Sequence, residues 1–155
     1  MPGDLEVLVQ IDSLCFPEVI AYNREHLLEY LRHRTARVFV VEYGRQVIGF
    51  ALTVHDKKEN QIHLITLDVI PQYQGLGVGK WLLDAVLQMA VCAKVVKIRL
   101  EVAVTNKKAI GLYRTFGFRI TRTLKKYYAD NTDGFLMVLW PRGPESTFGC
   151  ASNEN

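Results

Sequence analysis

A glycine-rich loop in the middle of the chain is the stretch with the clearest chemical meaning. It reads Gln74-Gly75-Leu76-Gly77-Val78-Gly79-Lys80 and lies between an apolar strand pattern and an apolar helix pattern. Glycines let a backbone approach a ligand closely, and a helix start adds free N–H donors and the positive end of a dipole. The loop therefore predicts a cradle for a pyrophosphate group, with a plain tight turn as the alternative.

Two other phosphate-binding motifs do not fit this loop. A P-loop needs Ser or Thr directly after Gly-Lys, but Lys80 is followed by Trp81. A dinucleotide fingerprint follows the first strand of a βαβ unit, whereas this loop follows three strand patterns. Glu101 does stand about as far downstream as the acid of that fingerprint, so the second exclusion depends on context.

Two residues downstream of the loop have side chains suited to proton transfer. Tyr113 follows Asn106 by seven residues, so both lie on one face of a predicted helix. Glu101 alternates with aliphatic residues in a predicted strand and so lies on the opposite face from them. The competing interpretations are a core aromatic for Tyr113 and, for Glu101, a solvated charge paired with Arg99 or Lys97.

The spacing of apolar residues predicts the elements that position these groups. Helices are expected after Asp4 and Asn23, which are good helix caps, with apolar residues at helical spacing behind them. Further helices are expected over 80–91 and 106–116, and strands over 37–43, 46–54, 61–69, 95–104, 118–125 and 134–140. This order predicts an α/β fold, a mixed sheet with helices on both faces. Residues 1–141 are expected to form a single domain, and 142–155 a flexible C-terminal tail.

Composition excludes several classes of protein. Of 155 residues, 49% are hydrophobic, which is enough to drive collapse and excludes disorder for most of the length. No apolar run approaches the roughly 18–20 residues that a spanning helix needs, and the start has no signal-type segment. A net charge of +3 is too mild to indicate nucleic acid. The four histidines are not at metal-ligand spacing, and the three cysteines form no close pair. We therefore expect a cytoplasmic protein with no metal, membrane or nucleic-acid partner.

The glycine loop and several later motifs resemble one family. Gln74-Gly75-Leu76-Gly77-Val78-Gly79 matches the Gln/Arg-x-x-Gly-x-Gly/Ala loop of the GNAT acetyltransferases. The downstream matches are Leu100-Glu101-Val102, Asn106, Ala109-Ile110, Leu112-Tyr113 and Phe116-Gly117-Phe118. Cys15-Phe16-Pro17, Lys125-Lys126-Tyr127-Tyr128 and Met137 resemble the N-terminal protein acetyltransferases of the ribosomal-protein-alanine (RimI) type. The resemblance covers roughly residues 4–140. Many relatives have a strand before the first helix, whereas this chain begins almost at that helix.

The resemblance implies the GNAT fold and acetyl-CoA as co-substrate. The glycine loop would then bind the pyrophosphate, through Gln74, Gly75, Leu76, Gly77, Val78, Gly79 and Lys80. Asn106 would contact the CoA arm, and backbone groups around Leu67 to Val69 would bind pantetheine, because this strand commonly carries a bulge in the family. The Val69 N–H could also polarise the thioester oxygen.

The resemblance also assigns roles on the catalytic and acceptor sides. Tyr113 is implied as general acid beside the sulfur, and Glu101 as general base, directly or through water. Tyr127 and Tyr128 would hold the backbone of an acceptor peptide, with a surface hairpin as the alternative. Tyr73 would line the substrate side or only cover the loop.

The expected reaction is direct acetyl transfer to a primary amine, first of all the α-amino group of a protein or peptide N-terminus. An α-amino group has a pKa near 7.7–8.0, against about 10.4 for lysine, so more of it is neutral and nucleophilic at pH 7. A small-molecule amine, a lysine side chain and a CoA-binding module with little activity are the alternatives. The sequence leaves the oligomeric state open, a homodimer included.

Overall fold

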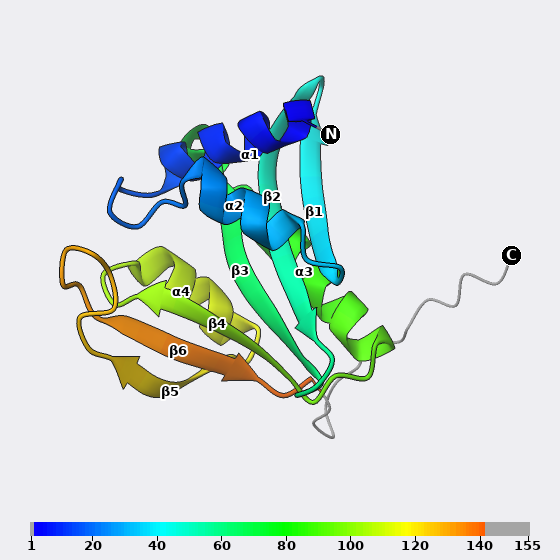
Figure 1. The fold of residues 1–155 in the computed structure, drawn as a ribbon, viewed down its shortest axis with the longest axis vertical. Coiled ribbons are helices and arrows are strands. Elements are labelled where there is room, and N and C mark those ends of the chain that lie inside the picture. The colour runs from blue at the N-terminus through cyan, green and yellow to red at the C-terminus, as the bar shows by residue number, and fades with distance from the viewer. Residues whose placement is uncertain (1, 142–155) are drawn as a thin grey trace, which may run out of the picture.

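A six-stranded mixed sheet organises the chain, and its strand order is β1-β2-β3-β4-β6-β5 (Figure 1). The computed structural model describes residues 2–141; the predicted tail, 142–155, lies outside the described residues. The helices are α1 (Pro2–Cys15), α2 (Arg24–Leu31), α3 (Val78–Cys92) and α4 (Lys107–Thr115). The strands are β1 (Ala36–Tyr43), β2 (Gln46–Asp56), β3 (Gln61–Val69), β4 (Lys97–Ala103), β5 (Arg119–Leu124) and β6 (Gly134–Leu139).

Helices cover both faces of the sheet, as predicted. On one face α1 and α2 pack their leucines against β2 and β3, around Phe50 and Leu52. On the other face α3 and α4 close a larger apolar core around Leu82, Leu83 and Ile98. Figure 1 shows α1 and α2 on one side of the strands and α3 on the other. No helix within residues 2–141 is long and apolar enough to cross a membrane.

The ends of the first two helices differ in how well the sequence predicts them. Asn23 caps α2 as expected, because its side chain accepts a hydrogen bond from the His26 N–H. Helix α1 begins at Pro2, so Asp4 lies in its first turn rather than at the cap, where its charge still suits the helix dipole. Leu14 is 61% exposed, so the stripe of buried apolar residues on α1 ends at Ile11.

Strands β3 and β4 pair in parallel for only three residues and then separate. The paired residues run from Gln61 with Lys97 to His63 with Arg99. Beyond them β3 stays paired with β2, and β4 stays paired with β6. The sheet therefore opens into a V, which Figure 1 shows between β3 and β4.

Strand β3 carries a bulge, as the resemblance implies. The register against β2 shifts between Leu52–Thr66 and Thr53–Leu64, which leaves Ile65 as the extra residue. Leu67 to Val69 follow the bulge and keep their pairing with β2. Their side facing β4 is open for a different reason, namely that β4 has already diverged.

Candidate active site

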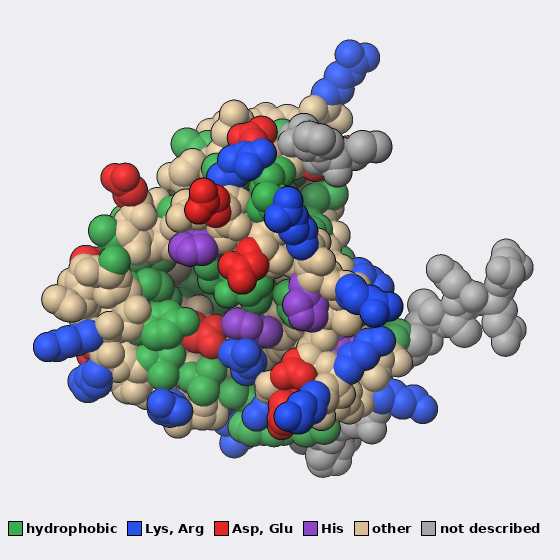
Figure 2. Space-filling view, viewed as in Figure 1, with side chains coloured by type: hydrophobic (Ala, Val, Ile, Leu, Met, Phe, Trp, Pro, Cys, Tyr) green, Lys and Arg blue, Asp and Glu red, His purple; other side chains and the backbone are tan. Residues whose placement is uncertain are grey.

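Two adjoining cavities occupy the V between β3 and β4. One, of about 270 Å³, lies between β3, β4 and the segment 16–22, and we call it the β4 cavity. The other, of about 530 Å³, lies between the glycine loop and α4, and we call it the loop cavity. Six residues line both: Cys15, Phe16, Leu67, Asn106, Ala109 and Tyr113. Figure 2 shows apolar side chains gathered around a hollow on this face, with Lys and Arg side chains around its margin.

The glycine loop lines the loop cavity with its backbone. Gly75 and Gly77 have φ angles of +78° and +88°, which a residue with a Cβ rarely adopts. Gly77 precedes α3 and has no side chain to cap it, so the first N–H groups of α3 are left for a ligand. The Gln74 side chain donates a hydrogen bond of 2.9 Å to the Val69 carbonyl, which fastens the loop to the end of β3.

The remaining loop residues differ in where their side chains lie, and only some of them line the cavity. Gly79 and Lys80 line the cavity, whereas the Leu76 side chain points to solvent and that of Val78 is buried in the core. Leu76 and Val78 can therefore contribute only backbone groups. Lys108 also lines this cavity, and the sequence analysis did not single it out.

A Gly77→Val variant should bind acetyl-CoA at least tenfold more weakly, a loss of about 1.4 kcal/mol. A β-branched residue at φ +88° is strained, and relaxing that strain moves the N–H groups of the cradle. Titration calorimetry gives the dissociation constant. Gly44→Val is the matched control, because Gly44 has φ +64° in the β1–β2 turn, outside both cavities. Unchanged affinity in folded Gly77→Val would refute the assignment of the loop.

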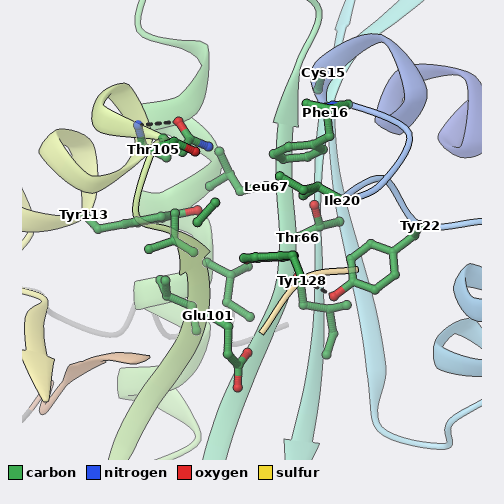
Figure 3. Close-up of a pocket in the computed structure, with 18 residues that line it drawn as sticks. Cys15, Phe16, Ile20, Tyr22, Thr66, Leu67, Glu101, Thr105, Tyr113 and Tyr128 are labelled. Atoms are coloured by element: carbon green, nitrogen blue, oxygen red, sulfur yellow. Dashed lines mark hydrogen bonds between the residues drawn. The ribbon is translucent and has the colours of Figure 1, made fainter. Parts of the chain in front are cut away.

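Tyr113 lies where the two cavities meet. Its ring packs against Phe118 with 5.6 Å between ring centroids, and only 6% of the residue is exposed. Its hydroxyl points into the cavity toward β3 (Figure 3). Burial, followed by the nearby Asp68 carboxyl group, raises the pKa of Tyr113, so the phenol stays protonated at any working pH. The residue thus joins a core ring to an O–H donor aimed into the site.

Asn106 starts α4 and lines both cavities. Its side-chain oxygen accepts a hydrogen bond of 3.2 Å from the Ala109 N–H, so this oxygen is used as the helix cap. The amide group that remains is the part that could meet a CoA arm.

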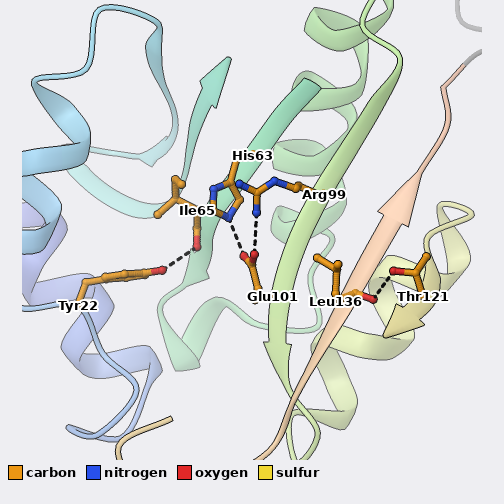
Figure 4. Close-up of polar contacts among 7 residues, drawn as sticks. All are labelled: Tyr22, His63, Ile65, Arg99, Glu101, Thr121 and Leu136. Carbon is orange, nitrogen blue, oxygen red and sulfur yellow. Dashed lines mark hydrogen bonds and ion pairs between the residues drawn. The ribbon is translucent and has the colours of Figure 1, made fainter. Parts of the chain in front are cut away.

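Glu101 lines the β4 cavity and is held from two sides. Its Oε2 accepts a hydrogen bond of 2.6 Å from His63 Nε2, and its Oε1 accepts one of 2.8 Å from Arg99 (Figure 4). Burial raises the pKa of Glu101, but the hydrogen bond from His63 and the charges of His63 and Arg99 outweigh it, and the net pKa is lowered. Glu101 is therefore a carboxylate at neutral pH. The sequence predicted the pairing with Arg99 but not that with His63.

Aromatic side chains surround the mouth of the β4 cavity. Tyr128 lines it, and Tyr127 stands edge-on to Tyr128 at 5.0 Å but is 50% exposed and does not line it. Asp133 fixes this loop by accepting a hydrogen bond of 2.8 Å from the Lys126 N–H. Tyr22 lines the opposite wall, and sequence reasoning missed it because it lies in an irregular segment.

Tyr73 does not line either cavity. Its ring lies 6.1 Å from that of Tyr43, and it packs against the core beneath the loop. Of the two interpretations of Tyr73, the structure favours the one in which it covers the loop.

Cys15 is a free thiol that lines both cavities. Its Sγ donates a hydrogen bond of 3.2 Å to the Val69 carbonyl. Burial, followed by the negative charge of the neighbouring Asp12–Asp68 pair, raises the pKa of this thiol to about 12. Because the thiolate is the nucleophilic form, Cys15 is poorly suited to accept an acyl group. Within the described part of the chain, no three His, Cys, Asp or Glu side chains group as metal ligands would.

Comparison with known proteins adds to this geometry. The family model described as "Acetyltransferase (GNAT) family" matches residues 5–118. An N-alpha-acetyltransferase of Sulfurisphaera tokodaii is 30% identical, over 87% of this chain and 86% of its own. The Escherichia coli ribosomal-protein-S18-alanine N-acetyltransferase superposes with a TM-score of 0.80 at 23% identity, covering 94% of each chain, and confirms the fold. Arabidopsis thaliana Naa50, solved with the bisubstrate analogue CoA-Ac-MVNAL, is 26% identical with a TM-score of 0.73, covering 90% of this chain and 93% of its own.

Proposed function

The chain belongs to the acetyltransferase (GNAT) family, and from this premise we propose that it transfers an acetyl group from acetyl-CoA directly to the α-amino group of a protein N-terminus. One observation carries the proposal: Tyr113 lies at the junction of a cavity built on the glycine loop and a cavity that holds Glu101. The donor and the acceptor would approach each other from opposite sides of this residue.

The loop cavity suits acetyl-CoA. The positive-φ glycines and the uncapped start of α3 offer N–H groups to a pyrophosphate, and Lys80 and Lys108 bring positive charge to the same cavity. The open edge of Leu67 to Val69 would pair with the pantetheine arm. Acetyl-CoA supplies an acyl group activated as a thioester.

The chain's own residues then account for the proton movements. The acceptor nitrogen forms a bond to the acetyl carbon as the bond from carbon to sulfur breaks. Glu101 takes the proton that the nitrogen loses, and Tyr113 donates its hydroxyl hydrogen to the departing sulfur. Both roles stay proposals, supported by an ionised carboxylate in one cavity and a protonated phenol at the junction.

The choice of an α-amino acceptor has two supports. A carboxylate whose pKa is lowered is a weak base, so the enzyme gains from an amine that is already partly neutral at pH 7. The β4 cavity is walled by Phe16, Tyr22 and Tyr128, which offer apolar surface and hydroxyls to a peptide. The relatives named as N-alpha-acetyltransferases agree with this choice.

An acceptor panel tests the proposal. Release of CoA is measured with a short peptide that has a free N-terminus and no lysine, with the same peptide N-terminally blocked and carrying a lysine, and with a polyamine. We expect the first to be the preferred substrate by a wide margin in kcat/KM. Preference for the lysine peptide or the polyamine would overturn the proposed acceptor but not the family. If none of the three acceptors led to release of CoA, a CoA-binding module with little activity would be favoured.

A Tyr128→Ala variant should raise KM for the acceptor peptide roughly tenfold, about 1.4 kcal/mol, and leave KM for acetyl-CoA unchanged. The reason is that Tyr128 lines the β4 cavity and not the loop cavity. Initial rates with each substrate varied in turn give both constants. Tyr128→Phe separates the ring from the hydroxyl, and equal KM values for peptide in wild type and Tyr128→Ala would contradict the assignment.

Three broader predictions also stay proposals. All helices and strands between residues 2 and 139 join one sheet or pack on it, which supports a single domain over 1–141. A cytoplasmic location would give the enzyme both acetyl-CoA and newly made N-termini. The third prediction concerns the oligomeric state, for which a homodimer is one option.

A further inference from the structure

Two carboxyl groups are buried behind the cavities, and the mechanism above uses neither. Asp12 on α1 is 0% exposed and Asp68 on β3 is 1% exposed. Asp12 Oδ2 accepts a hydrogen bond of 2.6 Å from the Tyr22 N–H, and Asp68 Oδ1 accepts one from the Thr66 hydroxyl. The other oxygen of each, Asp12 Oδ1 and Asp68 Oδ2, has no donor partner.

The two carboxyl groups lie within reach of a hydrogen bond to each other, and each changes the pKa of the other. Two ionised carboxylates cannot form such a bond, because neither carries a proton; one proton between them satisfies both oxygens. Burial raises the pKa of Asp12 and, together with the charge of Asp12, raises that of Asp68 well above its usual range.

Within residues 2–141, the groups that affect the pKa values of the pair include no positive charge that would favour two ionised carboxylates. The titratable groups that interact with it are the Cys15 thiol from α1 and the Tyr113 phenol from α4, both neutral. From β2, the residue paired with Asp68 is Phe50, which is apolar. One shared proton is thus the arrangement that fits these neighbours.

We propose that Asp12 and Asp68 share one proton and that this bond positions the segment 16–23, the acceptor-side wall, against β3. The inference rests on the proposed function, because it concerns how the acceptor peptide is held. Phe16, Ile20 and Tyr22 of this segment line the β4 cavity (Figure 3). Tyr22 is anchored twice, through its N–H to Asp12 and through its hydroxyl to the Ile65 carbonyl at 3.4 Å. Without the shared proton, two like charges would push α1 and Tyr22 away from β3. Asp12 and Asp68 are positioning residues, since neither lines a cavity.

Asparagine substitutions test whether the two carboxyl groups share one proton. In Asp68→Asn the amide oxygen can still accept from Thr66 and the amide N–H can donate to Asp12, so KM for peptide should stay within about twofold of wild type. In Asp12→Asn the amide N–H can donate to an ionised Asp68, so KM for peptide should again stay within about twofold of wild type. In the double asparagine variant the two amide NH2 groups face each other, and neither can accept a hydrogen bond. KM for peptide should therefore rise at least tenfold, while the dissociation constant for acetyl-CoA stays unchanged. If the increase in KM for peptide in the double variant equalled the product of the increases in the two single variants, the proposal would be overturned.

The pH dependence gives a second test that needs no acceptor. The folded state holds the proton at pH values where an unfolded Asp, with a pKa near 3.9, has lost it. Wild type should therefore lose thermal stability relative to Asp68→Asn as pH rises above about 4. Parallel pH profiles of Tm for the two proteins would overturn the shared proton. Failure of the acceptor panel would instead overturn the proposed function and leave this profile interpretable.

Discussion

A Tyr113→Phe variant is expected to lose roughly 10²–10⁴ in kcat, the usual range for a general acid, while it folds and binds acetyl-CoA normally. The ring of Tyr113 packs against Phe118, and phenylalanine keeps that contact. What disappears is a hydroxyl that points into the junction of the two cavities and stays protonated because burial raises its pKa. The departing thiolate would then lose its donor, so the chemical step should slow.

Single-turnover rates and calorimetry with acetyl-CoA separate this loss from a loss of binding. Tyr43→Phe is the matched control, since Tyr43 is largely exposed and lines neither cavity. Wild-type turnover in Tyr113→Phe would return Tyr113 to the role of a core aromatic.

A Glu101→Gln variant should lose roughly 10² or more in kcat/KM at pH 7 and recover much of it at high pH. At pH 7 most of an α-amino group is protonated, and above its pKa of about 8 the neutral amine no longer needs the same help. The measurement is a pH profile of kcat/KM for both proteins. A loss of equal size at every pH would indicate a structural or anchoring role for Glu101.

The pairing of Glu101 provides a control with a defined direction. Arg99 and His63 lower the pKa of Glu101, so the acid limb of the wild-type profile should lie below the usual range of a glutamate. Arg99→Gln removes one positive charge and should move that limb to higher pH, with activity retained at neutral pH. An acid limb that does not move would mean that another group controls it.

Local signals explain why so much of the fold and the loop could be predicted from the sequence. Helix α4 follows a capping Asn106 and ends before Gly117, and both positions are set by hydrogen bonds within a few residues. The glycine loop is equally local, because Gly75 and Gly77 stand where the backbone needs a positive φ. The alternation around Glu101 also predicted correctly that its side chain lies on the opposite face of β4 from the buried Leu100 and Val102.

Contacts between distant segments account for what the sequence could not predict. The separation of β3 from β4 after His63 depends on how two halves of a sheet twist apart, and no residue pattern encodes it. Tyr22 and Lys108 enter the cavities only because the V brings their segments together. The Asp12–Asp68 pair joins residues 56 positions apart, and each alone resembles an ordinary polar side chain.

The most direct test of the account is to locate the acetyl group on a peptide that carries both a free N-terminus and an internal lysine. The peptide is incubated with the enzyme and acetyl-CoA at pH 7, and tandem mass spectrometry assigns the modified nitrogen. We expect acetylation at the first residue with the lysine largely untouched, and loss of the product with Tyr113→Phe. Acetyl groups found mainly on the lysine side chain would contradict the proposed acceptor.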